Sequence, residues 1–307
     1  MTSTVAIVGV GEVGGAAAYA MILHNVCTNI MLVDKRQSHR DGQVKDLNNS
    51  SFKEQNGAHV QAATFREASQ ADVIVIAAAA KRGIGETNLN HLYRSTATLR
   101  SIIGAMRPFK KNAILLIVTH PVDILTSLAY EVSGLPPAQV IGTGTLLDSV
   151  RLRGMLAEQV GVAASSIDAM VVGEHGGSQF VPWSLVEVGG VPIDELVGPD
   201  GISKEKVVQQ CKHEGECIIE EKGAITFGIA SVISVICTSI LLDRRQIYPV
   251  SHVQPEHGCS LSMPAVIGRN GIERTLPISL APSEKLELEH SAREVKRVVG
   301  QLRDNWD

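Results

Sequence analysis

The stretch Val5-Ala-Ile-Val-Gly9-Val-Gly11-Glu-Val-Gly14 joins a short apolar, β-branched run to three glycines with the spacing G-x-G-x-x-G. Gly9 permits a tight turn, Gly11 lets the backbone approach a phosphate group, and Gly14 lets a following helix pack closely on the strand. Asp34 closes the next apolar run, 20 residues after Gly14. A carboxylate at that place accepts hydrogen bonds from ribose hydroxyls. Together these residues predict a strand–turn–helix unit that binds a dinucleotide.

The residues around Asp34 bear on which dinucleotide is bound. The carboxylate of Asp34 would repel a 2′-phosphate, which favours NAD over NADP. Lys35 and Arg36 follow directly. Because basic side chains at that point can accommodate a phosphate, they leave NADP open as an alternative.

Further apolar runs alternate with helical stretches through the rest of the first half. They predict a doubly wound α/β fold of the Rossmann type, with a parallel sheet covered by helices on both faces. The expected segments are a helix from Gly14 to about His24 and strands at Ile30–Asp34, Asp72–Ala77 and Ala113–Thr119.

The pattern changes after about Gly142, and we expect an α+β half to follow. The sequence therefore predicts an NAD-binding domain at residues 1–143 and an α+β catalytic or substrate domain at residues 144–307. The expected helices of this half are Asp148–Val160, Lys204–Glu221, Thr226–Asp243 and Ser283–Arg303, and the expected strands are Ala169–Gly173 and Trp183–Val188.

Composition excludes several classes of protein. The chain has 307 residues, 44% hydrophobic and 20% charged, with a net charge of −4, so neither a nucleic acid nor a membrane surface is expected as a partner. The five cysteines include no C-x-x-C pair, which predicts reduced thiols in the cytoplasm. The histidines show no ligand spacing, and no metal is expected. The apolar residues Ile225–Leu242 are interrupted by Ser and Thr, which favours a buried helix over a membrane span.

A histidine and two charged residues in the second half form a candidate catalytic site. His175 lies in the loop Gly173-Glu-His-Gly-Gly-Ser, and Asp148 and Arg151 lie three residues apart on one predicted helix. A carboxylate facing His175 would fix its tautomer and raise its pKa, while an arginine one turn along can hold a substrate carboxylate. The spacing alone fits a second interpretation equally well, in which Asp148 and Arg151 form a surface ion pair and His175 is an unrelated loop histidine.

At these residues the chain resembles the lactate/malate dehydrogenase family, and most closely its L-2-hydroxyacid dehydrogenases of the lactate and hydroxyisocaproate type. The resemblance runs nearly end to end. It rests on Gly9–Gly14, Asp34, Gly85–Thr87, Pro121–Ile124, Val140–Asp148, Gly173–Gly176 and Met263–Gly271. It implies that His175 is the proton donor and acceptor, Asp148 its partner and Arg151 the carboxylate clamp. It also implies a homodimer or homotetramer.

Three positions depart from the family pattern, and all three concern the substrate rather than the cofactor. Asn88 stands where the family's mobile loop carries an arginine that polarises the substrate carbonyl. His120 replaces the asparagine of an Asn-Pro pair, and Ile225 replaces a small polar residue. Arg82 aligns with the loop position that selects the substrate side chain, and it is either a substrate-binding residue or a solvated loop charge. His120 either donates a hydrogen bond near the nicotinamide or caps a strand end.

The sequence therefore predicts an oxidoreductase that transfers a hydride between NAD(H) and a small-molecule 2-keto or 2-hydroxy acid other than simple lactate. Two alternatives stay open at this point. One is an enzyme on the same scaffold with a changed reaction or a specialised substrate. The other is a non-catalytic homologue that binds NAD, against which the joint presence of His175, Asp148 and Arg151 argues.

Overall fold

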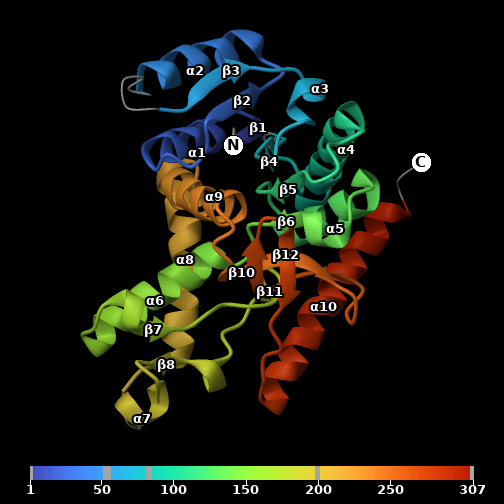
Figure 1. Ribbon diagram of the computed structural model, residues 1–307. Helices are drawn as coiled ribbons and strands as arrows, with labels where there is room; N and C mark the ends of the chain where they lie inside the picture. The colour runs from blue at the N-terminus through green and yellow to red at the C-terminus, as the bar shows by residue number, and fades with distance from the viewer. Residues whose placement is uncertain (1–2, 51–56, 81–84, 198–200, 305–307) are drawn as a thin grey trace.

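The computed structural model describes residues 3–50, 57–80, 85–197 and 201–304. Its largest element is a nine-stranded sheet with the order β12-β11-β10-β6-β5-β4-β1-β2-β3 (Figure 1). The strands from β6 to β3 pair parallel with one another, and their order 3-2-1-4-5-6 is that of a dinucleotide-binding fold. The predicted doubly wound parallel sheet is thus confirmed.

The first half of the chain supplies the parallel strands and the helices between them. The strands β1, β4 and β5 are wholly apolar or nearly so and buried on both faces, as expected for a covered parallel sheet. The elements are β1 Thr4–Val8, α1 Glu12–Leu23, β2 Asn29–Val33, α2 Gln37–Ser50, β3 His59–Ala62, α3 Phe65–Ala68, β4 Val73–Ile76, α4 Asn88–Met106, β5 Ile114–Ile117, α5 Val122–Ser133, the 3-10 turn Pro137–Gln139 and β6 Val140–Gly142.

The second half adds a three-stranded antiparallel extension to the large sheet and a separate small sheet. Strand β10 pairs antiparallel with β6 at Ser251 and Gly142, so one sheet runs through both halves without a break. The elements are α6 Leu146–Val160, 3-10 turns at Ala164–Ser166 and Trp183–Leu185, β7 Ile167–Asp168, β8 Glu187–Val188, β9 Val191–Pro192, α7 Ile193–Val197, α8 Lys204–Lys222, α9 Thr226–Leu241, β10 Gln246–Gln254, β11 Cys259–Gly268, β12 Gly271–Thr275 and α10 Pro282–Arg303. The division of the chain at residue 143 stays a prediction.

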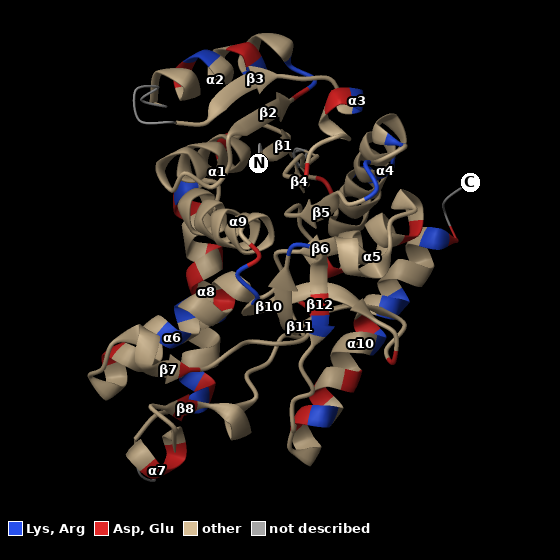
Figure 2. Ribbon diagram, viewed as in Figure 1, with Lys and Arg blue, Asp and Glu red and all other residues tan. Residues whose placement is uncertain are grey.

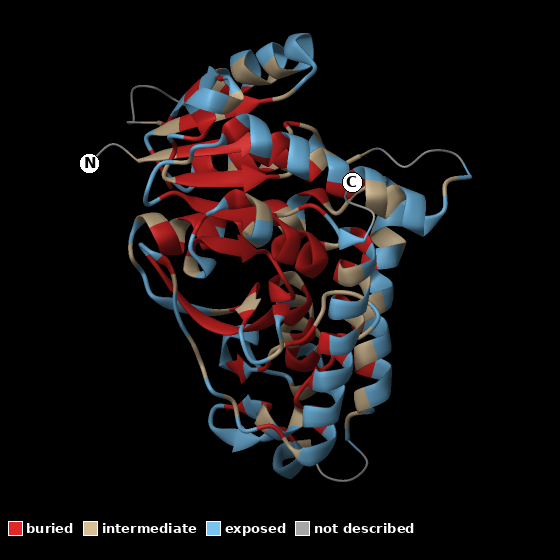
Figure 3. Ribbon diagram, turned by 90° about the vertical axis from the view of Figure 1, so that its right-hand side faces the viewer, coloured by how far each residue is buried: buried red, intermediate tan, exposed pale blue. Residues whose placement is uncertain are grey.

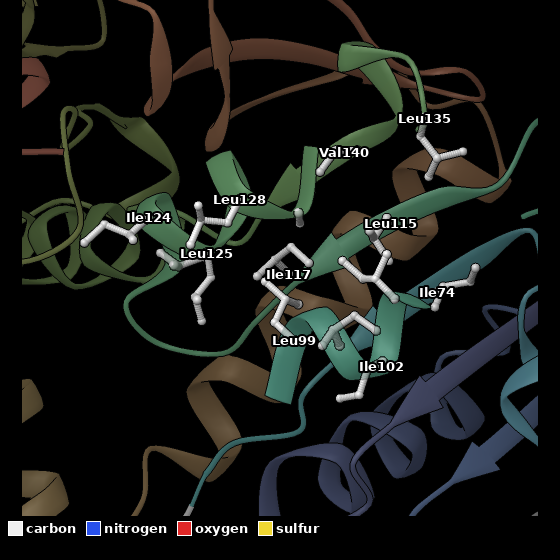
Figure 4. Close-up of a cluster of buried hydrophobic side chains, with 14 of the residues drawn as sticks. Ile74, Leu99, Ile102, Leu115, Ile117, Ile124, Leu125, Leu128, Leu135 and Val140 are labelled. Carbon is white, nitrogen blue, oxygen red and sulfur yellow. The ribbon is translucent and has the colours of Figure 1, made fainter. Parts of the chain in front are cut away.

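Helices cover both faces of the large sheet, which leaves the buried strands between two layers (Figure 3). Helices α1, α2 and α9 contribute to the core on one face, and α3, α4, α5 and α10 to the core on the other. Figure 4 shows the second core, where Leu99 and Ile102 of α4 and Leu125 and Leu128 of α5 meet the β5 residue Ile117. Basic and acidic residues are interspersed along α10 (Figure 2).

Two predicted strands of the second half are wrong in extent. Within Ala169–Gly173 only Val172 and Gly173 form bridges, and they pair with different segments, at Phe180 and Ser262. This segment passes from the small sheet to the large one, so no continuous ladder forms along it. Within Trp183–Val188, a 3-10 turn follows Pro182 and only Glu187–Val188 is a strand.

Candidate active site

The candidate site residues lie at the carboxyl ends of the parallel strands. The turn at Gly9 follows β1, Asp34 follows β2 and His120 follows β5. Helix α6, which carries Asp148, begins shortly after β6. Ligands of open α/β sheets bind at this edge, because successive strand ends there present loops and helix N-termini to one crevice.

The glycine turn after β1 is shaped to admit a pyrophosphate. Gly9 has φ +92°, and a Cβ atom there would lie 2.5 Å from the Cα atom of Ala78. A Cβ atom on Gly14 would lie 2.0 Å from the carbonyl oxygen of Gly9, so α1 packs against the turn only without a side chain there. A Cβ atom on Gly11 would meet nothing within 4 Å, and no side chain caps the helix that follows it. The backbone N–H groups at the start of α1 therefore face open space, as an anion site requires.

Asp34 is held as a carboxylate at the end of β2. Its two oxygens accept hydrogen bonds from the backbone N–H groups of Val10, at 3.1 Å, and Arg36, at 2.9 Å. Burial alone would raise the pKa of Asp34, but these bonds and the Arg36 guanidinium, 3.5 Å away, lower it overall. The glycine turn and this carboxylate fit the pyrophosphate and ribose of a dinucleotide.

His175 and Asp148 form a buried hydrogen-bonded pair. His175 Nδ1 lies 2.7 Å from Asp148 Oδ2, and the aspartate side chain is only 4% exposed, against 33% for the histidine. Burial alone would lower the pKa of His175, but the hydrogen bond and charge of Asp148 and the charge of Asp123 outweigh it and raise the pKa. The pair thus leaves Nε2 of His175 as the nitrogen free to exchange a proton with a ligand.

Asp123, on the first turn of α5, holds the loop that carries His175. Its Oδ2 accepts the backbone N–H of His175 at 2.7 Å, and its Oδ1 accepts the hydroxyl of Ser262 at 3.0 Å. Burial raises the pKa of Asp123 to about 6, although these bonds partly oppose the shift. Sequence reasoning did not assign Asp123 a role. The motif Pro121–Ile124 contained the only signal for it.

Arg151 lies one helical turn beyond Asp148, with its side chain 8% exposed. Its guanidinium is 3.4 Å from Asp148 Oδ1 and 3.8 Å from Glu214 Oε1 on α8. Both contacts are longer than a good charge-assisted hydrogen bond, so the guanidinium group keeps N–H donors for a further carboxylate. Glu214 had no signal in the sequence, because it lies more than 60 residues after Arg151 along the chain.

His120 also belongs to this group. Its ring centroid is 5.8 Å from that of His175, and the two rings are nearly perpendicular at 87°. His120 is exposed to solvent, unlike the strand β5 that precedes it. The structure therefore brings His175, Asp148, Arg151 and His120 together at one place.

Two of the remaining residues predicted from the sequence lie at helix N-termini. Asn88 is the exposed first residue of α4. Ile225 is half-buried immediately before α9, whose Thr226 hydroxyl lies 3.5 Å from a carboxylate oxygen of Glu12 at the start of α1. The start of α9 thus lies beside the dinucleotide turn. Arg82 lies outside the described residues.

Two family models match consecutive parts of the chain. The model described as lactate/malate dehydrogenase, NAD binding domain, matches residues 3–142, and that described as lactate/malate dehydrogenase, alpha/beta C-terminal domain, matches residues 145–304. The chain belongs to the lactate/malate dehydrogenase family. It is therefore an NAD-binding oxidoreductase of that family, which agrees with the fit of Gly11 and Asp34 to a dinucleotide.

Individual relatives are similar over nearly their whole length. The L-lactate dehydrogenase A of Rhizopus oryzae is 38% identical over 296 residues, which cover 96% of this chain and 92% of the relative. An L-lactate dehydrogenase of Gloeobacter violaceus is also 38% identical, over 304 residues, with the same coverage. Among solved structures, the minor L-lactate dehydrogenase of Enterococcus mundtii is 31% identical with a TM-score of 0.92, covering 98% of each chain. A lactate dehydrogenase from a deep-sea metagenome library is 28% identical with a TM-score of 0.93, covering 98% of this chain and 99% of that one.

The described part of the chain has neither a cluster of metal ligands nor a single helix that could span a membrane. No group of three or more His, Cys, Asp or Glu side chains there is placed to hold a metal ion. No single described helix is long and apolar enough to cross a membrane, and only the bent pair of α8 and α9 together has a sufficient length and composition among the described residues.

Proposed function

We propose that this oxidoreductase interconverts a 2-keto acid and a 2-hydroxy acid with NAD(H), and that its substrate has a larger side chain than pyruvate. The observation that carries the reaction is the His175–Asp148 pair, joined at 2.7 Å and lying one helical turn from the guanidinium of Arg151. A proton donor beside a carboxylate clamp suits a substrate whose carbonyl group is adjacent to a carboxylate.

Each residue of the group has a defined task in this reaction. NADH, when bound, supplies the hydride. Arg151 holds the substrate carboxylate through two N–H groups and so fixes the position of the neighbouring carbonyl. Asp148 accepts a hydrogen bond from the N–H at Nδ1 of His175, which orients the ring and stabilises its protonated form. His175 then gives its Nε2 proton to the carbonyl oxygen in reduction and takes it back in oxidation.

Three departures from the family pattern support a substrate other than pyruvate. Asn88 replaces a cationic donor to the carbonyl, and removing such a donor costs about 3–4 kcal/mol of transition-state stabilisation. His120 and Ile225 change the volume and polarity of the walls beside it. A small keto acid has few other contacts with which to offset this loss, whereas a larger side chain contributes binding energy of its own.

A non-catalytic NAD-binding homologue is the competing function. Nothing in such a protein would require a buried carboxylate to hold a loop histidine in one tautomer, at the cost of desolvating Asp148. We also propose that the protein is cytoplasmic and forms a homodimer or homotetramer.

The test is an initial-rate assay of NADH oxidation with pyruvate, oxaloacetate, 2-ketoisocaproate and phenylpyruvate. The proposal expects turnover with at least one of the two larger keto acids, and slow turnover with pyruvate and oxaloacetate. Fast turnover of pyruvate, in the range of tens per second or more that ordinary enzymes reach, would contradict the proposed substrate. Binding of NADH without turnover of any keto acid would contradict the proposed reaction.

A further inference from the structure

His120 is a solvent-facing side chain with unused hydrogen-bonding capacity beside the proton donor. It follows β5, where the neighbouring Thr119 hydroxyl binds the backbone carbonyl of Ala78. Within the described part of the chain, no group forms a hydrogen bond with either ring nitrogen of His120 itself. Its ring lies edge to face with that of His175, 5.8 Å between centroids. His120 thus places a ring with unused N–H capacity beside the ring of His175.

The surroundings of His120 keep its imidazole uncharged. Although solvent reaches the ring, the protein atoms packed around it penalise the charged form, and positive charge on His175 and His91 opposes a further charge. These effects lower the pKa of His120 to about 4. His175 has the opposite tendency, because Asp148 and Asp123 raise its pKa. The site thus holds one histidine whose charged form its neighbours favour and one whose neutral form they favour.

A neutral imidazole carries one N–H group, which it donates without giving up the proton. Resting on the proposed function, we propose that His120 is a catalytic residue that donates a hydrogen bond to the carbonyl oxygen of the substrate, alongside His175. In a site without the loop arginine, this bond stabilises the negative charge that develops on the oxygen during reduction.

The step balances without a change in the protonation of His120. The hydride adds to the carbonyl carbon, and the π electrons of the C=O bond move to the oxygen. The oxygen takes the Nε2 proton of His175, which becomes neutral. The N–H of His120 stays bonded to its nitrogen throughout and donates to the oxygen before and after transfer.

The kinetic test replaces His120 by asparagine, which keeps a side-chain N–H donor, and by phenylalanine, which keeps a ring without one. The matched control is His59→Asn, an exposed histidine of β3 at the far edge of the sheet. With the keto acid that wild type reduces fastest, His120→Phe lowers kcat roughly 10- to 100-fold with little change in KM, because the donor acts in the transition state. His120→Asn retains part of this activity. A kcat for His120→Phe within threefold of the His59→Asn value, in folded protein, overturns the proposal.

A binding test separates failure of this inference from failure of the proposed reaction. The probe is oxamate, an unreduced mimic of a 2-keto acid, added to the NADH-saturated protein while the histidine ring nitrogens are followed by NMR. We expect the His120 N–H signal to shift on oxamate binding, and this shift to be absent in His120→Phe.

If oxamate shifts the signal although wild type turns over no keto acid, the proposed reaction fails and the donor role stands. If oxamate binds and leaves the His120 signal unchanged, the donor role is wrong whatever the turnover. If oxamate does not bind and wild type turns over no keto acid, both proposals fall together.

Discussion

Replacing Asp148 by asparagine removes the charge from the His175 pair while keeping nearly the same side-chain volume. In the structure the Nδ1–Oδ2 distance is 2.7 Å and the carboxylate is 4% exposed, so solvent screens this contact little. A hydrogen bond to a charged group contributes about 1.5–3 kcal/mol. This hydrogen bond stabilises the protonated ring during proton transfer. Its loss therefore lowers kcat roughly 10- to 150-fold, at about 1.4 kcal/mol per factor of ten.

The pH profile of Asp148→Asn gives a second readout with a definite sign. Burial lowers the pKa of His175 and Asp148 raises it beyond the ordinary value, so removing the charge of Asp148 lowers the pKa. Reduction needs protonated His175, and its rate therefore falls as the pH rises through that pKa. In the variant this fall begins at a lower pH. Oxidation of the hydroxy acid needs neutral His175, so its rate increases as the pH rises through the same pKa. In the variant this increase also begins at a lower pH.

The assay measures kcat for the reduction over a pH series, with the melting temperature as a check on folding. The asparagine side chain can also turn its NH2 group toward Nδ1 and favour the wrong tautomer, which would add to the loss. A kcat within threefold of wild type, or a reduction profile that does not move toward lower pH, would refute the role given to the pair.

Three further predictions concern the cofactor, the clamp and the loop. Fluorescence titration should show tighter binding of NADH than of NADPH, with a smaller difference in Asp34→Ser, because the carboxylate that repels a 2′-phosphate is gone; tighter binding of NADPH by wild type would point to Lys35 and Arg36 instead. Arg151→Leu should raise the KM for the keto acid roughly 100-fold and leave NADH affinity unchanged, since a charge-assisted bidentate contact is lost, and an unchanged KM would exclude Arg151 as the clamp. Asn88→Arg should raise kcat for a small keto acid about tenfold, equivalent to about 1.4 kcal/mol, whereas lower activity on every substrate tested would mean that Asn88 is adapted to another ligand.

The parts of the fold that depend on neighbouring residues were predictable from the sequence. The turn from Gly9 to Gly14 has its three glycines within one strand–helix connection, and steric crowding at Gly9 and Gly14 accounts for two of them. The helices α6, α8, α9 and α10 have nearly the predicted bounds, because their apolar periodicity is a local property.

The parts that depend on contacts between distant segments were not predictable in the same way. Strand β3 was missed, because His59–Ala62 is short and has one buried residue. Joining of β10 to β6 rests on the pairing of Ser251 with Gly142, more than 100 residues apart, and no local pattern reports it. For the same reason no role could be predicted for Asp123, because its contact with the backbone N–H of His175 forms only in the folded chain.

The most direct test of the account follows the hydride itself. Wild type and His175→Ala are incubated with NADH deuterated at C4 and 2-ketoisocaproate, and the 2-hydroxy acid is analysed by mass spectrometry. The account predicts that wild type forms the hydroxy acid with deuterium at C2, while His175→Ala binds NADH with unchanged affinity and forms almost no product. Absence of deuterated product from wild type with this and the other keto acids, or equal product from His175→Ala, would contradict it.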